Sequence, residues 1–172
     1  MEFTFYQNTR PYFKTGDLLL WQGNSAIAKI IQLFGNTFNH ASYVINSNIC
    51  GVKRILLYEA LASGVKPTFL SHRLKTYNGS CFWLQLKTKF DYLRCEIYRN
   101  ANVYGGVGYD FKGLFKNAFG YVSVDAEKLF CSEYIYLAGI KAGLPKGSVT
   151  KAPKPDDLIK LGWWKKPVKI EV

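Results

Sequence analysis

The sequence predicts an α+β domain in which a small antiparallel sheet is packed against helices. Four short segments before residue 88 are apolar or alternating and rich in β-branched and aromatic residues, which is typical of strands. After residue 88 the apolar residues recur at helical spacing instead. A sheet in the first half and helices in the second half indicate an α+β fold. The 172 residues, of which 48% are apolar, fit a single domain over 1–172.

The predicted strands come first. Residues 15–23 (TGDLLLWQG) are predicted to form a buried strand bounded by glycines. A helix is predicted next, at 24–35 (NSAIAKIIQLFG), where Asn24 or Ser25 can cap the first turn. The further predicted strands are 40–45 (HASYVI), 54–61 (RILLYEAL) and 80–87 (SCFWLQLK). Residues 46–51 (NSNICG) are rich in turn formers and are predicted to connect two of them.

The predicted helices of the second half are 90–104, 109–119, 131–143 and 154–162. The third has the clearest apolar stripe, formed by Ile135, Ala138, Gly139 and Ala142. The last has Pro155 near its start and acidic residues in its first turn, and both features favour a helix N-terminus.

The formal net charge of +11 favours anionic partners such as nucleic acid, acidic lipid surfaces or acidic substrates. The lysines are scattered except near the C-terminus, and no run of five like charges occurs, which argues against a specific nucleic-acid site. The segment 162–167 (GWWKKP) suggests contact with an anionic membrane surface, and the alternative is that its tryptophans pack on the core. No apolar run reaches the ~18 residues of a transmembrane helix. Because no signal-peptide pattern is seen, we expect a cytoplasmic protein, which would leave the cell by lysis or injection.

Four cysteines, at positions 50, 81, 95 and 131, contain no Cys-x-x-Cys spacing. This pattern predicts no metal site. A disulfide framework is not expected in a domain of this size without a secretion signal. We therefore expect free thiols in a reducing compartment.

Only two histidines, His40 and His72, are available to pair with a cysteine. His72 falls in a polar segment that is predicted to be exposed. If the strands on either side of NSNICG pair around a loop centred between Ile49 and Cys50, His40 lies directly opposite Glu59. Opposed side chains stand ~5 Å apart at Cβ, within reach of a His–Glu hydrogen bond. A one-residue slip would place the two on opposite faces, and the alternative for Glu59 is an exposed strand residue or a partner for a lysine.

Cys131 is the cysteine whose predicted position suits chemistry best. If a helix begins there, its thiol lies among unpaired backbone N–H groups at the positive end of the helix dipole, which favours the thiolate. The thiolate would be the nucleophile, a histidine would transfer protons, and a carboxylate would orient the histidine. The backbone N–H of Cys131 would donate to the oxyanion. The alternative of a buried, inert thiol fits Cys50, Cys81 and Cys95 better.

Five motifs, in the order GDLLL, HASYV, YEA, GVGYDF and FCSEYI, resemble those of the permuted papain-like cysteine enzymes. These enzymes are the circularly permuted branch of the NlpC-type fold, and the similarity is to their YiiX-like members. The order histidine, acidic residue, cysteine marks this family, and the resemblance covers roughly residues 15–160, nearly the whole chain.

The resemblance implies roles for particular residues. It implies that Cys131 is the nucleophile, His40 the base and Glu59 the residue that orients His40. It places Tyr109 and Asp110 near the site, in substrate contact or loop support; the alternative is a core tyrosine and a helix cap by Asp110.

The resemblance also implies a papain-like fold and an activity: hydrolysis or transfer of an acyl group at an amide or ester bond, through an acyl-enzyme and without a metal or organic cofactor. Substrates in the wider family range from peptidoglycan stem amides to acyl lipids. A small peptide, an amino-acid amide or an acyl lipid is therefore the expected substrate, with a peptidase or amidase favoured. Several family members are exported, which the lack of an export signal does not match. The alternative function is a basic binding module for anionic membrane or nucleic acid, in which the thiol is incidental.

Overall fold

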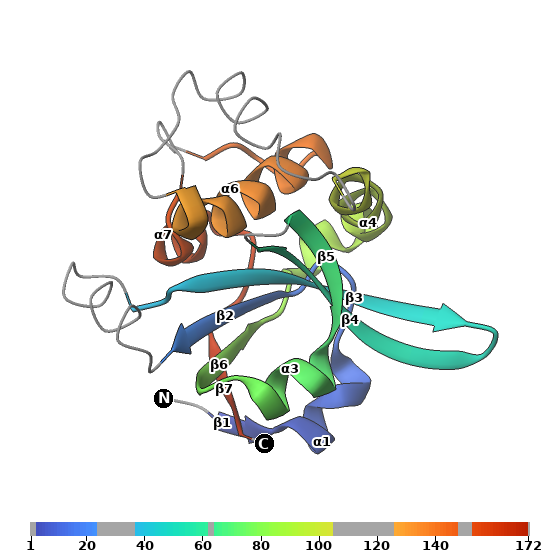
Figure 1. Ribbon diagram of the computed structural model, residues 1–172. Coiled ribbons are helices and arrows are strands. Elements are labelled where there is room, and N and C mark those ends of the chain that lie inside the picture. Colours follow the sequence, from blue (N-terminus) through green and yellow to red (C-terminus); the bar gives the residue numbers. More distant parts are fainter. Residues whose placement is uncertain (1–2, 24–36, 62–63, 105–125, 148–152, 172) are drawn as a thin grey trace.

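The computed structural model describes residues 3–23, 37–61, 64–104, 126–147 and 153–171. Within these residues the predicted α+β class is confirmed, because a seven-stranded sheet carries helices on both of its faces (Figure 1). The helices predicted at 24–35 and 109–119 lie outside the described residues.

The sheet has the strand order β1-β7-β6-β2-β3-β4-β5. Its first pair, β1 and β7, is parallel, and every other pair of neighbours is antiparallel. The strands are β1 (Phe3–Phe5), β2 (Leu18–Gly23), β3 (His40–Ile49), β4 (Val52–Leu61), β5 (Gly64–Phe69), β6 (Gly79–Leu84) and β7 (Val168–Glu171). The sequence did not predict β1, β5 or β7. The first and last strands lie side by side at one edge, so the two ends of the chain close the sheet (Figure 1).

The helices form two layers (Figure 1). One face of the sheet carries α4 (Arg94–Val103), α6 (Ala126–Lys141) and α7 (Pro155–Lys160), and the other carries α1 (Tyr6–Thr9) and α3 (Leu70–Thr76). Short 3-10 turns, η1 (Arg10–Tyr12) and η2 (Thr88–Leu93), precede β2 and α4. The helix predicted at 90–104 is thus a 3-10 turn followed by a shorter α-helix, and α7 matches its prediction closely. No helix among the described residues is long and apolar enough to cross a bilayer.

Strand β2 shows why the sheet is buried on both faces. Its residues alternate between two cores: Leu18 and Leu20 pack with α4 and α6, whereas Leu19 and Trp21 pack with α3. All four side chains are fully buried. Burying a leucine side chain stabilises the fold by roughly 2 kcal/mol. A strand with helices on both sides needs no polar face, which explains the continuous apolar run.

The β3–β4 hairpin is longer than the sequence predicts. Its turn consists only of Cys50 and Gly51, whose φ values of 50° and 80° are those of a two-residue primed turn. The predicted loop at 46–51 is therefore mostly strand. The register pairs Tyr43 with Tyr58. Continued along the strands, it places Ser42, rather than His40, opposite Glu59, so the predicted direct pairing is wrong by two residues.

Helix α6 begins at Ala126, so the prediction of a helix start at Cys131 is wrong. Cys131 lies more than one turn inside the helix, beyond the first four N–H groups that a helix leaves unpaired. Two tyrosines fix the helix on its neighbours: Tyr43 donates to the Ile135 carbonyl over 2.9 Å, and Tyr134 donates to the Ala101 carbonyl over 3.0 Å. These bonds hold α6 against β3 and α4.

The tryptophans of GWWKKP pack on the core, as one of the two interpretations of this segment expects, and do not lie at a membrane surface. Trp163 and Trp164 are 0% and 4% exposed. Their ring N–H groups donate to the carbonyls of Pro145 and Gly16, each over 2.9 Å. Neither indole is available to a lipid interface.

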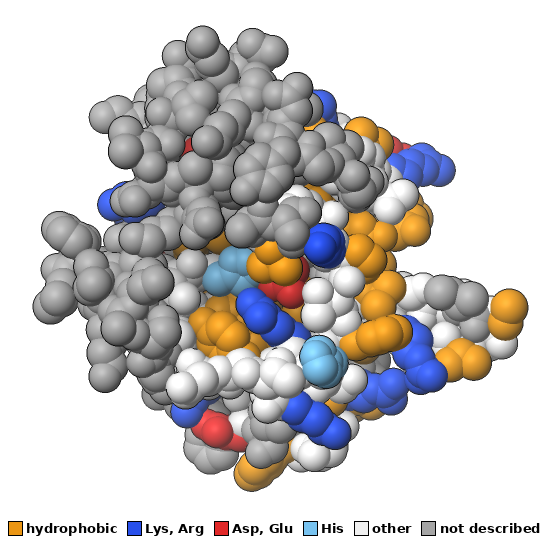
Figure 2. Space-filling model, viewed as in Figure 1, with side chains coloured by type: hydrophobic (Ala, Val, Ile, Leu, Met, Phe, Trp, Pro, Cys, Tyr) orange, Lys and Arg blue, Asp and Glu red, His pale blue; other side chains and the backbone are white. Residues whose placement is uncertain are grey.

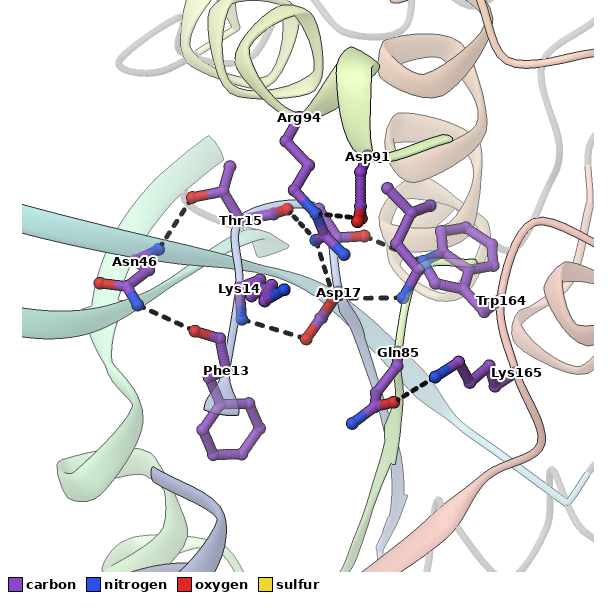
Figure 3. A network of polar contacts seen from close by, with 12 residues as sticks. Phe13, Lys14, Thr15, Asp17, Asn46, Gln85, Asp91, Arg94, Trp164 and Lys165 are labelled. Carbon is purple, nitrogen blue, oxygen red and sulfur yellow. Dashed lines mark hydrogen bonds and ion pairs between the residues drawn. The ribbon is translucent and has the colours of Figure 1, made fainter. Parts of the chain in front are cut away.

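A buried carboxylate fixes the start of β2. Asp17 is 1% exposed and accepts four hydrogen bonds, from the backbone N–H groups of Lys14 and Leu86, the ring of Trp83 and the guanidinium of Arg94. Figure 3 shows Asp17 in a polar network that joins residues 13–17, which precede β2, to the β3–β4 hairpin and to α4. These hydrogen bonds fix the position of Asp17, the residue before β2, relative to β6 and α4.

Candidate active site

His40 and Glu59 meet on the sheet, as the sequence predicts, although the register differs. Nε2 of His40 lies 2.7 Å from Oε2 of Glu59. The two residues are diagonal neighbours on adjacent antiparallel strands, a separation that long polar side chains can bridge. Their side chains are 12% and 1% exposed, respectively. The contact is thus shielded from water on the side of Glu59 and open to it on the side of His40.

Cys131 reaches the same imidazole from the helical layer. Its side chain forms a hydrogen bond with His40 and interacts with it electrostatically. Because Nε2 faces Glu59, the other ring nitrogen, Nδ1, is left for the sulfur. Three residues that are far apart in the sequence therefore meet in the order Cys131, His40, Glu59. The thiol is completely buried, so a substrate reaches it only when neighbouring atoms move.

The charges of this cluster support one another. Burial acts to lower the pKa of His40, but the interactions with Cys131 and Glu59 outweigh it and raise that pKa from 6.5 to about 9. Burial acts to raise the pKa of Glu59, but the hydrogen bond and charge of His40, helped by Arg73, hold it below its ordinary value. The imidazole is therefore a cation, and the carboxylate an anion, at neutral pH.

The sequence prediction missed Arg73. It projects from α3, and its Nη2 lies 3.6 Å from the Glu59 oxygen that contacts His40. Its guanidinium lies over the ring of Trp21 at 5.5 Å and over the ring of Tyr77 at 5.2 Å. Figure 2 shows histidine, basic and hydrophobic side chains gathered on this face. The segment around His72 was predicted to be polar and exposed, and no helix was predicted there. The sequence therefore gave no indication that Arg73 contacts Glu59.

A second carboxyl group lies on the helix that carries Cys131. Glu133, two residues after Cys131, is 5% exposed, and burial raises its pKa to about 7. Ser132 between them donates to the Pro153 carbonyl over 2.6 Å, which fixes this turn of the helix. The backbone N–H of Cys131 was predicted to donate to the oxyanion. It is not available for this role, because an N–H this far inside a helix bonds to the carbonyl four residues earlier.

The other predicted site residues have mixed outcomes. Tyr109 and Asp110 lie outside the described residues. His72 is exposed, as predicted. All four cysteines are free, as expected, but Cys50 and Cys95 are exposed rather than buried, whereas Cys81 is buried.

Two cavities lined by described residues lie away from the three candidate catalytic residues. One, of about 190 Å³, lies beside Asp17 and Arg94. The other, of about 260 Å³, lies between Arg10, Arg54 and Phe69. No cluster of three or more His, Cys, Asp or Glu side chains that could hold a metal ion occurs in the described part of the chain.

Comparisons with family models and with curated proteins found no match to this chain. The site is therefore interpreted from its own groups: a thiol that interacts with an imidazole, and a buried carboxylate that contacts the same imidazole. This arrangement can perform nucleophilic chemistry, in which the imidazole transfers protons and the carboxylate orients it.

Proposed function

We propose that this protein is a cysteine-dependent hydrolase or acyltransferase of the permuted papain-like kind, which cleaves an amide or ester bond. One observation carries the proposal: His40 contacts Glu59 over 2.7 Å on one side and Cys131 on the other. The motif order His, acidic residue, Cys and the α+β architecture, with a helix carrying the cysteine packed on a strand carrying the histidine, also support it.

The chemistry would proceed in two steps. The Cys131 thiolate attacks the carbonyl carbon of the substrate, the carbon–leaving-group bond breaks, and the His40 imidazolium gives its proton to the leaving group. His40 then takes a proton from water, or from another acceptor, which attacks the thioester and releases the acyl group. Glu59 keeps the ring oriented and stabilises its positive form throughout.

The raised pKa of His40 fits this role. A histidine that stays protonated up to about pH 9 beside a thiol is a ready proton donor for a poor leaving group such as an amine. We place amide substrates first, and thus a peptidase or amidase, because an amine leaving group needs a proton donor more than an alcohol does.

The test is intact-mass and peptide-mass analysis of the protein after incubation with a panel of peptidyl, amino-acid amide and acyl-lipid substrates. We expect an acyl adduct on Cys131 that is lost in Cys131→Ala and does not form in His40→Ala. The matched controls are Cys95→Ala and His72→Ala, which remove an exposed thiol and an exposed histidine. Adducts on Cys95 alone, or an adduct on Cys131 that survives His40→Ala at the wild-type rate, would contradict the proposal.

A further inference from the structure

Arg73 has an orientation that is fixed before any ligand binds. The rings of Trp21 and Tyr77 lie 5.5 Å and 5.2 Å from its guanidinium carbon. A guanidinium over aromatic rings is held by cation–π attraction, and two rings at an angle to each other limit how it can turn. Tyr77 is itself held by a hydrogen bond from its hydroxyl to Asn39 over 3.1 Å, and Trp21 by a hydrogen bond from its ring N–H to Ser42 over 2.7 Å.

The donors of this guanidinium are unused in the described part of the chain. Its Nε is buried and has no hydrogen-bond partner there. Its nearest acceptor is Oε2 of Glu59, at 3.6 Å from Nη2, which is an ion pair but longer than a hydrogen bond. Arginine has five N–H donors, and buried groups of this kind are almost always hydrogen-bonded. The side chain is 26% exposed, so a ligand can reach its outer edge.

The position of Arg73 ties it to the candidate catalytic residues. Its Nη2 and the Nε2 of His40 contact the same oxygen of Glu59. The guanidinium is therefore separated from the Cys131 sulfur by one carboxylate oxygen and one imidazole ring, roughly 12 Å at most. Lys66, the exposed partner of Glu59 on β5, adds a second positive charge beside this edge.

We propose that Arg73 binds an anionic group, a carboxylate or a phosphate, on the acyl donor that Cys131 attacks. The inference rests on the proposed function, whose substrate class it specifies: acids rather than neutral amides or esters. A carboxylate or phosphate accepts two parallel hydrogen bonds from the planar fork of a guanidinium, and the ion pair of Arg73 with Glu59 engages only Nη2. Glu59 is already committed to His40, so the outer edge of the fork stays open to the substrate.

The test compares two thiol reagents that differ by one carboxylate group. N-ethylmaleimide and 3-maleimidopropionate are applied to the wild-type protein, and the rate at Cys131 is read by peptide mass, with exposed Cys95 as the internal reference. We expect the ratio of anionic to neutral rates at Cys131 to exceed that at Cys95 by on the order of 10- to 100-fold. A maleimide bearing a phosphate monoester forms the second arm, and its ratio relative to the carboxylate tells which anion the site prefers.

The variant Arg73→Gln separates binding from support of the fold. We expect its ratio at Cys131 to fall to that at Cys95, and Arg73→Lys to keep a part of it, because a lysine retains the charge but not the fork. If Arg73 only supports Glu59, both rates at Cys131 change together and the ratio persists, which overturns the proposal. Equal ratios at Cys131 and Cys95 in the wild type overturn it as well.

A second measurement needs neither a reactive thiol nor turnover. Glutarate is titrated into the wild-type protein while the ring signals of His40 and His72 are followed by NMR. We expect a saturable shift of the His40 signal, with no shift at His72, and its loss in Arg73→Gln. Absence of a saturable shift would overturn the anion site even if the protein proves to be a hydrolase. A saturable shift without hydrolysis would support the anion site and contradict the proposed function.

Discussion

Nε2 of His40 lies 2.7 Å from Oε2 of Glu59, although the two residues are diagonal and not opposite on their strands. The hairpin register pairs Tyr43 with Tyr58, so Ser42 is the residue across from Glu59. Side chains two positions apart on a strand share a face. The contact therefore depends on which face the side chains share and on how far they reach. It occupies Nε2 of His40, so Nδ1 is left to interact with the sulfur of Cys131.

The first prediction concerns the charge on His40. Glu59→Gln removes the negative charge but keeps the size of the side chain, so we expect the pKa of His40 to fall from about 9. Cys131→Ser should lower the pKa of His40 more than Glu59→Gln does, because the interaction with Cys131 raises this pKa more than the interaction with Glu59. The measurement is an NMR titration of the two histidine ring signals.

The exposed glutamate of α4, Glu96, gives a matched control, because its ion pair with Arg99 lies on the surface. Glu96→Gln should leave the His40 titration unchanged. A pKa of His40 that is the same in Glu59→Gln as in the wild type would show that the contact with Glu59 does not raise this pKa.

The second prediction concerns stability and pH. Because the pKa of His40 is raised from 6.5 to about 9 in the folded protein, the native state binds its proton more tightly than the unfolded chain does. The resulting stabilisation, on the order of 3 kcal/mol, is complete below pH 6.5 and is lost as the pH rises to about 9. Urea unfolding at several pH values should show this fall in the wild type and a flatter profile in His40→Gln. Parallel profiles for the two proteins would contradict it.

The third prediction tests how α6 is packed. A Cβ at Gly139 would lie 2.5 Å from the ring of Trp163, which is fully buried and cannot turn aside. Gly139→Ala should therefore destabilise the protein by about 1–3 kcal/mol, despite the better helix propensity of alanine. Lys141→Ala, at an exposed position of the same helix, is the control for the effect on helix propensity. A Gly139→Ala protein as stable as the wild type would mean that α6 lies further from the sheet.

The sequence predicted the parts of the site that depend on pattern, and it missed those that depend on tertiary contact. Alternation placed His40 and Glu59 on one face of adjacent strands, and an error of two residues in the register did no harm, because an even shift preserves the face. The start of α6 was placed too late, although Asp125, a residue type favoured at helix N-caps, directly precedes Ala126 in the sequence. Any chemistry at this thiol must therefore depend on His40, because the helix N-terminus is more than one turn away.

Arg73 escaped prediction for a similar reason. Helix α3 has only two buried residues, Leu70 and Leu74, so its pattern is too short to stand out. The contact of Arg73 with Glu59 and with two aromatic rings arises only because α3 packs against β4 and β5. No local signal in SHRLK could show this.

The last prediction concerns the buried carboxylate of Asp17. Burial raises its pKa in spite of the nearby charge of Arg94, so the four hydrogen bonds that it accepts are what hold it in place. Asp17→Ala leaves the Trp83 ring and two backbone N–H groups without this acceptor and removes one of the acceptors of Arg94, and we expect a loss of about 3–5 kcal/mol. Arg94→Met removes only one of the four donors and should cost less. Denaturant unfolding of both variants checks the order, and a larger loss for Arg94→Met would mean that the ion pair, rather than the backbone bonds, fixes the entry of β2 into the sheet.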